Sequence, residues 1–354
     1  DYETELDTLR RFRNEELLRI GVNDIHGLLE AAEVGGELST LAEVCLEAAL
    51  AIAVKALAAR YGPPPGRFAV FALGKLGRRE LTYNSDLDLI FVYDRSGDPP
   101  APLSVHEYFA KLAQRLIVVL QLTTREGYVY KIDTRLRPSG SHGPLVSSLE
   151  GFREYHQGSS AVWERQALIS ARGVAGDRSL IEQTEGVIEG FVYGRGLTAE
   201  EAAEIARLRA RMERELARES VERWNLKIGR GGLVDVQFVA EMLQLRHGRD
   251  HPRVRSRGIE EALDRLEEED LLEPGHHHVL TGAYRFLRRV ESRLRIERDQ
   301  AVEMLDSGDP KLPVLARRLG YDGAPDSAAR QLLLEIASTR DGVRRVYERY
   351  FGAD

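Results

Sequence analysis

The chain has very little cysteine, no long apolar stretch and no excess of positive charge, and each shortage excludes a class of protein. A single cysteine, Cys45, excludes an internal disulfide and is typical of a protein from a reducing cytoplasm. No apolar run approaches the roughly 20 residues that span a bilayer, and no signal peptide pattern opens the chain, so we expect no membrane association. The formal net charge of −7 gives no support to a nucleic-acid-binding surface.

What is present is the composition of a soluble globular protein. Hydrophobic residues make up 43% of the chain and charged residues 30%. A length of 354 residues predicts two domains with sizeable cores. Because the chain begins with Asp1 rather than methionine, we expect it to be a piece of a longer protein.

Two strand-like runs, 68–73 and 87–93, enclose the segment that carries the clearest chemistry. Side chains alternate along a strand, so Asp86 and Asp88 project to one side, while Leu87 and Leu89 point into a core. Adjacent carboxylates repel each other and need a cation, for which Mg²⁺ is a natural partner. The alternative is an ordinary turn at 84–86 followed by a solvent-facing aspartate.

Residues before the two aspartates favour a phosphate-binding interpretation. Gly74 and Gly77 lie where the backbone can approach a phosphate closely, and Ser85 offers another oxygen. We place Lys75 with them among the predicted nucleotide-binding residues. The segment is not a Walker A loop, because Leu76 stands where that motif has serine or threonine.

A third strand-like run, 127–132, ends in Asp133 and is followed by Arg135 and Arg137. Three aspartates with nearby arginines are the groups that metal-assisted nucleotidyl transfer requires. We therefore predict that Asp86, Asp88 and Asp133 bind metal and are catalytic.

Longer stretches of the sequence point to a family more specifically than these spacings do. The first stretches read GKLGRREL…SDLDLIF, DTRLRPSG…GPLV and WERQALISARGVAGD, and later ones read NLKIGRGGLVDVQFVAEMLQL and YRFLRRVESRLR. Together they resemble the glutamine synthetase adenylyltransferase/adenylyl-removing enzymes of the polymerase-β-like nucleotidyltransferase superfamily. The resemblance covers nearly the whole chain.

That resemblance implies a cytoplasmic, Mg²⁺-dependent enzyme of nitrogen metabolism that uses ATP as substrate. Its protein substrate is glutamine synthetase, which it adenylylates on a tyrosine, and a PII-type signal protein is the candidate regulator. Asp133 is the candidate proton acceptor, and Arg135 and Arg137 are expected to neutralise charge on the phosphate in the transition state.

The resemblance also implies an α+β fold with a polymerase-β-like nucleotidyltransferase core. We predict a catalytic domain with N-terminal helices over residues 1–150 and an all-helical domain over 151–354. In the second domain, Lys227 and Asp235 bracket a glycine interruption, for which a helix cap and a nucleotide contact remain alternatives. Gln237 stands where the family usually has glutamate, which argues against an acidic function there.

Family members carry two active sites, one that attaches AMP and one that removes it by phosphorolysis. Thr134 and Ser139 in DTRLRPSG, together with WERQAL, resemble the adenylylating C-terminal half. Lys227-Ile228-Gly229 is closer to the removing half, so the evidence is divided and we favour adenylylation. Two further alternatives are uridylylation of a PII-type protein and a non-catalytic docking module for glutamine synthetase.

Overall fold

The two strands predicted around Asp86 form the centre of a sheet in the computed structural model, which describes residues 2–95, 103–298 and 302–352. The chain divides into two compact units, Asp1–Gly194 and Arg195–Asp354. The predicted boundary after residue 150 falls inside the first unit. That unit continues to Gly194 because a later strand pairs with the first one and a later helix packs against it.

The sheet of the first unit has five strands and mixed directions. Its order is β3-β2-β1-β5, and β4 also pairs with β2. The β1–β2 and β1–β5 pairs are antiparallel, whereas β3 and β4 run parallel to β2 along the same edge. The strands are β1 (Gly66–Ala72), β2 (Leu87–Arg95), β3 (Ile132–Asp133), β4 (Val146–Ser148) and β5 (Arg172–Gly176).

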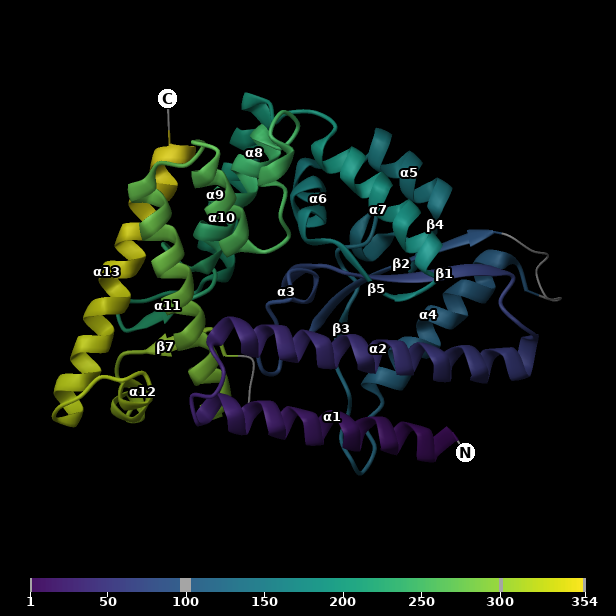
Figure 1. Cartoon of the computed structure of the whole chain (residues 1–354), viewed down its shortest axis with the longest axis horizontal. Coiled ribbons are helices and arrows are strands. Elements are labelled where there is room, and N and C mark those ends of the chain that lie inside the picture. Colours follow the sequence, from purple (N-terminus) through teal and green to yellow (C-terminus); the bar gives the residue numbers. More distant parts are fainter. Residues whose placement is uncertain (1, 96–102, 299–301, 353–354) are drawn as a thin grey trace. The chain divides into compact units, whose positions relative to one another are not determined.

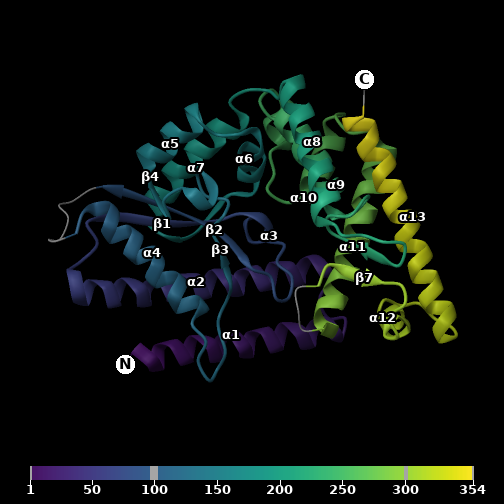
Figure 2. The same ribbon diagram turned by 180° about the vertical axis from the view of Figure 1, so that it is seen from behind.

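Helices cover both faces of this sheet. α5 and α7 pack on one face, α2 and α4 pack on the other, and α1 lies beside α2 (Figures 1 and 2). The helical segments are α1 (Tyr2–Ile25), α2 (Ala31–Tyr61), α3 (Gly74–Gly77), α4 (Val105–Gln121), α5 (Leu149–Gly158), α6 (Val162–Ala167) and α7 (Arg178–Tyr193), with 3₁₀ turns η1 (Gly140–His142) and η2 (Leu168–Ser170).

The core side of β2 is formed by the residues that the alternation predicts. Leu87 and Leu89 are fully buried, and Phe91 and Tyr93 continue the row. Phe91 stacks on Phe68 of β1, with ring centroids 5.9 Å apart. Beyond Asp88 the opposite side of β2 is buried too, because α5 and α7 cover it. The middle of the strand is therefore buried on both sides, and only its two ends are accessible.

The second unit is mostly helical, which confirms the predicted fold class. It also holds a two-stranded ribbon, β6–β7, that the prediction of an all-helical domain missed. The ribbon joins segments about 80 residues apart, so local sequence gives it little signal. The elements of the second unit are α8 (Ala199–Leu216), β6 (Arg223–Asn225), α9 (Leu233–His247), η3 (Pro252–Val254), α10 (Ile259–Glu268), α11 (Pro274–Arg298), β7 (Met304–Asp306), α12 (Leu312–Arg318) and α13 (Pro325–Phe351).

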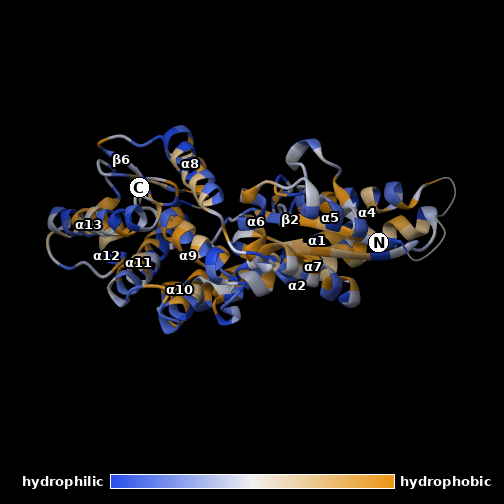
Figure 3. Ribbon diagram, turned by 90° about the horizontal axis from the view of Figure 1, so that it is seen from above, coloured by the Kyte–Doolittle hydropathy of each residue, from blue (hydrophilic) through white to orange (hydrophobic). Residues whose placement is uncertain are grey.

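The charged helix α8 has one narrow apolar face. Only Ile205 and Arg209 are buried along its length, and its surface is mainly hydrophilic (Figure 3). In the described part of the chain, no helix combines the length and apolar character needed to cross a membrane.

Candidate active site

The turn after β1 brings Gly74 against the second aspartate of β2. Gly74 has a φ of +56°, and a Cβ atom at this position would lie 2.5 Å from the Oδ2 atom of Asp88. The backbone N–H of Leu73 donates to the carbonyl of Asp88 at 2.9 Å. Glycine is favoured here because side chains rarely adopt this backbone angle and a Cβ atom would displace the Asp88 carboxylate.

Gly77, at the end of α3, is required for a different reason. A Cβ atom there would lie 2.0 Å from the backbone oxygen of Ser170. The Ser170 hydroxyl accepts a hydrogen bond from the N–H of Gly74 at 2.9 Å and donates to the carbonyl of Ala167. The structure thus gives this glycine a packing role, which the sequence reasoning, directed at phosphate contact, did not foresee.

The predicted acidic residues lie at or next to the first residues of β2. Asp88 is the register partner of Asp133 on the parallel strand β3, and Asp86 is exposed just before β2. Residues 127–131 of the predicted third strand are not in a strand, so β3 is only two residues long. Those two residues are sufficient to bring the third carboxylate beside the second.

Arg135 supplies a cationic group to these carboxylates. Its Nε atom lies 2.8 Å from Oδ2 of Asp133, and its backbone N–H donates to Oδ1 at 2.9 Å. Hydrogen bonds from Arg135 lower the pKa of the Asp133 carboxyl. In return Asp133 raises the pKa of Arg135, and the charges of Asp88 and Asp86 add to that effect. One guanidinium therefore lies in the field of all three carboxylates.

The donor chemistry of this cluster suits a hard divalent cation. Three carboxylates are oxygen ligands of the kind that Mg²⁺ prefers, and they already attract one cationic group. Within the described ranges, no three His, Cys, Asp or Glu side chains lie close enough together to hold a metal. In this structure the Asp133 carboxylate instead contacts Arg135.

A hydrogen-bonded turn precedes Asp86. Nζ of Lys75 donates to the hydroxyl of Thr82 at 3.1 Å, and that hydroxyl lies 2.8 Å from the hydroxyl of Ser85. The N-terminal helices hold the same turn, since the Tyr83 hydroxyl donates to Oδ2 of buried Asp24 on α1 at 2.9 Å. The sequence reasoning missed this support because nothing local links α1 to residue 83.

Arg137 contacts the loop between Asp133 and β4. Its guanidinium donates to the oxygens of Thr134, to the Ser141 carbonyl and to the Gly143 carbonyl. Arg137 is thus directed at its own loop in this structure, whereas Arg135 faces the carboxylates.

In the second unit, the glycine interruption before α9 is held by buried charges. Asp235 is fully buried and pairs with equally buried Arg209 through an Nε–Oδ1 contact of 2.5 Å. Its other oxygen accepts the N–H of Gly231 at 2.8 Å. Asp235 thus bonds the glycine interruption from the first turn of α9, whose N-cap is Gly232 and has no side-chain cap hydrogen bond.

The N-terminus of α9 is also occupied. The N–H groups of Leu233 and Val234 donate to the carbonyls of Leu226 and Lys227. The Lys227 side chain is 38% exposed, and its ammonium pairs with Glu303 at 2.8 Å. These two amides are therefore not available to a phosphate in this structure, because backbone carbonyls already accept them.

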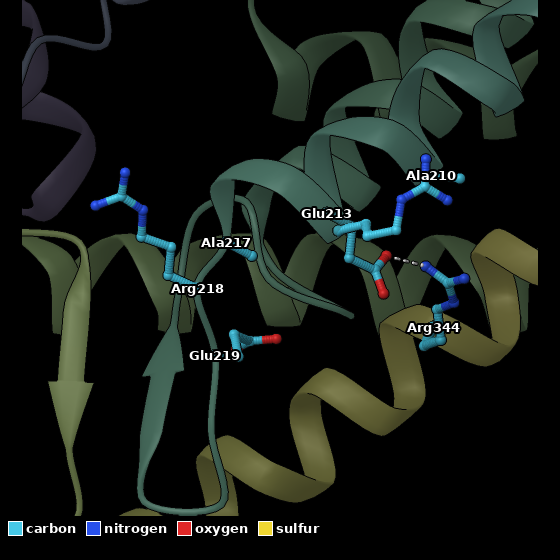
Figure 4. Close-up of a pocket in the computed structure, with 7 residues that line it drawn as sticks. Ala210, Glu213, Ala217, Arg218, Glu219 and Arg344 are labelled. Carbon is cyan, nitrogen blue, oxygen red and sulfur yellow. Dashed lines mark hydrogen bonds and ion pairs between the residues drawn. The ribbon is translucent and has the colours of Figure 1, made fainter.

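A pocket of about 350 Å³ in this unit lies between α8 and α13. Figure 4 shows that charged side chains line it, with Glu213 and Arg344 paired across it at 2.9 Å. Arg344 also approaches Asp235, so the pocket wall is continuous with the buried ion pair.

Two family models match the chain. The model of glutamate-ammonia ligase adenylyltransferase matches residues 1–187, and that of PII-uridylyltransferase matches residues 200–351. Glutamate-ammonia ligase is another name for glutamine synthetase.

Curated relatives point the same way. A Nitrosococcus oceani protein is 40% identical over 330 residues, covering 90% of this chain and 34% of its own length. One from Thioalkalivibrio sulfidiphilus is 38% identical over 355 residues, covering 98% of this chain and 36% of its own. Both are named bifunctional glutamine synthetase adenylyltransferase/adenylyl-removing enzyme. The chain spans about a third of the length of these relatives.

Proposed function

The chain belongs to the glutamate-ammonia ligase adenylyltransferase family, and from this premise we propose that it transfers AMP from ATP to a tyrosine of glutamine synthetase. The observation that supports the proposal most is the pairing of Asp88 with Asp133 on adjacent strands, with Asp86 two residues away. The similarity of the relatives supports the choice of protein substrate.

Asp86, Asp88 and Asp133 would hold Mg²⁺, and Gly74 keeps the Asp88 carboxylate uncrowded. A bound Mg²⁺ neutralises phosphate charge and lowers the pKa of a hydroxyl nucleophile. Ser85 lies in the turn that leads to Asp86, and Lys75 on α3 reaches that turn through Thr82; both are proposed contacts to the nucleotide phosphates.

Asp133 is the proposed acceptor of the tyrosine proton. Because Arg135 lowers its pKa, this carboxylate is ionised at neutral pH but is a weak base. It therefore depends on a tyrosine that has already been made more acidic.

Arg135 is the arginine that we assign to the transferring phosphate. Its side chain is 79% exposed, so it can turn from Asp133 towards a phosphate with little loss of packing. Arg137 acts in this proposal by keeping the loop in shape, because its donors point into the loop. In the second unit, Lys227 remains a proposed nucleotide contact and would have to leave Glu303 to make it.

The direction of transfer rests on sequence features. Thr134 and Ser139 favour adenylylation, and the hydroxyl of Thr134 is used in the loop, where it accepts from Arg137 at 3.1 Å. Lys227-Ile228-Gly229 favours the removing reaction, which is the second candidate.

Two incubations distinguish these reactions. The chain is mixed with unmodified glutamine synthetase, Mg²⁺ and ATP, and separately with adenylylated glutamine synthetase and phosphate, and the target is followed by intact mass. We expect a gain of AMP in the first mixture. Loss of AMP in the second mixture alone would assign the removing reaction. A third mixture with UTP and a PII-type protein tests the match of residues 200–351 to PII-uridylyltransferase, and no transfer is expected there.

A further inference from the structure

A hydrogen bond joins the loop that follows Asp133 to helix α5. Ser139 has a left-handed backbone with a φ of +61°, which is uncommon for a residue with a side chain. Its N–H donates to the hydroxyl of Tyr155 on α5 at 3.0 Å. This bond joins residues 16 positions apart and holds the loop at its turn.

The same hydroxyl donates to a carboxylate behind it. Oη of Tyr155 lies 2.8 Å from Oε1 of Glu164 on α6. A phenol has one proton; the N–H of Ser139 can only donate to the phenol oxygen, whereas a carboxylate oxygen accepts, so the proton points to Glu164. The three groups form a relay with a defined direction, from the loop amide through Tyr155 to Glu164.

Glu164 lies in an unusual place for a carboxyl. Only 7% of the residue is exposed, and its Oε2 atom has no hydrogen-bond partner within the described residues. Burying a carboxyl with one of its oxygens unsatisfied costs stability compared with an apolar side chain of the same volume. Fold stability is therefore not what this carboxyl supplies.

The loop transmits a displacement at Ser139 because it is stiff. Arg137 links Thr134, Ser141 and Gly143 through one guanidinium. Its carbonyl also accepts the N–H of Gly140 at 2.8 Å. A shift of the turn at Ser139 would therefore move the residues that Arg137 links, including Thr134, which follows Asp133 directly.

We propose that Glu164, acting through Tyr155, is a positioning residue that holds the loop after Asp133 in the geometry required for nucleotidyl transfer. The inference rests on the proposed function, because that loop carries Arg135 from Asp133 towards the reacting phosphate. Neither Glu164 nor Tyr155 needs to touch the substrate.

Two substitutions interrupt the relay without removing a charge from the site itself. Tyr155→Phe deletes only the hydroxyl, and Glu164→Leu removes the acceptor behind it. Each should lower kcat by about 10- to 100-fold, the range expected when catalytic groups are displaced by about an ångström. The KM for ATP should change much less, because the displaced group is Arg135, which we assign to the transferring phosphate in the transition state.

Three comparisons separate positioning from a general loss of structure. Glu164→Gln keeps an oxygen that accepts from Tyr155 and should stay near the wild-type rate. The double variant Tyr155→Phe/Glu164→Leu should be no slower than Tyr155→Phe alone, because the two groups act in series. Tyr108→Phe, which deletes a hydroxyl that donates to the Gly62 carbonyl elsewhere in the same unit, is the matched control and should leave kcat unchanged.

Amide hydrogen exchange gives a readout that does not depend on activity. The Ser139 amide should exchange faster in Tyr155→Phe and Glu164→Leu, and at the wild-type rate in Glu164→Gln. If the variants exchange faster but the wild type neither attaches nor removes AMP, the link between Glu164 and the Ser139 loop is supported and the proposed function is refuted. An unchanged kcat of Tyr155→Phe in an active enzyme, or equal losses in the Gln and Leu variants of Glu164, would overturn the positioning role.

Discussion

Acid should destabilise the first unit through one histidine. His156 on α5 is buried, and aromatic rings surround it, with the centroid of Phe152 at 4.4 Å, Phe191 at 4.8 Å and Tyr155 at 5.1 Å. Neither ring nitrogen has a hydrogen-bond partner among the described residues. Because such a site disfavours the charged form, burial lowers the pKa of His156 from 6.5 to about 4.

The size of the effect follows from those two pKa values. A group whose pKa is lowered in the folded state contributes stability that is complete above its unfolded pKa of 6.5 and is lost as the pH falls towards 4. Each pH unit in that window removes about 1.4 kcal/mol, so at pH 5 the loss is about 2 kcal/mol. For a unit of this size, 2 kcal/mol corresponds to about 4–8 °C in melting temperature.

The assay compares melting temperatures at pH 8 and pH 5 for the wild type and for His156→Phe, which fills the same cage with a ring that does not titrate. The drop between the two pH values should be smaller in the variant by about 4–8 °C. His26→Gln, at an exposed histidine near the end of α1, is the control and should retain the wild-type drop. Equal drops in wild type and His156→Phe would refute the assignment of the acid sensitivity to this residue.

Three further substitutions test the packing around the site and in the second unit. Arg137→Lys keeps the charge but loses the planar fork that joins the loop, so it should lower both the melting temperature and the rate per folded molecule; a normal melting curve with a lost rate would instead place Arg137 on the phosphate. Gly77→Ala should destabilise by about 1–3 kcal/mol in urea titration, because its Cβ would meet a backbone oxygen at 2.0 Å, whereas Gly186→Ala on α7 meets nothing within 4 Å and should not. Asp235→Leu leaves buried Arg209 without its nearest carboxylate, with only the more distant Glu213 at 3.5 Å, and should cost about 3–5 kcal/mol in the second unit. Replacing both Asp235 and Arg209 by leucine should recover much of that loss, and an equally unstable double variant would contradict the ion-pair explanation.

Local signals in the sequence predicted the elements that carry the site. The apolar alternation predicted β1 and β2 to within a few residues of their bounds, and Ser104 with Glu107 forms a capping box of α4 that the local sequence contains. The Asp-x-Asp spacing predicted Asp86 and Asp88 on one side of a strand, and the structure has Asp88 in β2 and Asp86 just before it. In each case the determining interaction lies within a few residues, so the sequence alone contains it.

What the sequence could not predict depends on contacts between distant segments. The bond from Tyr83 to Asp24 spans 59 positions, and the β6–β7 ribbon spans about 80. The packing of Gly77 on η2 is equally remote in the chain. No pattern of propensity or periodicity encodes such pairs.

Other positions are ambiguous in the sequence for a chemical reason. Glycine near a predicted phosphate site serves equally well for backbone approach to a ligand and for close packing, and the structure shows the second role at Gly77. An arginine next to aspartates can pair with those carboxylates or with its own loop, and Arg135 and Arg137 divide into these two orientations. Side-chain direction, which decides both questions, is a property of the folded chain.

The most direct test of the central claim is the transfer of AMP to glutamine synthetase by wild type, Asp88→Asn and Asp94→Asn at matched folding. Asp88 and Asp94 lie on the same strand, but Asp94 is at its far end and pairs with Arg67. If the carboxylates at the start of β2 form the transferase site, intact mass will show AMP on the target with wild type and Asp94→Asn, and a loss of several orders of magnitude with Asp88→Asn. Transfer by Asp88→Asn at a rate near that of the wild type would contradict the account.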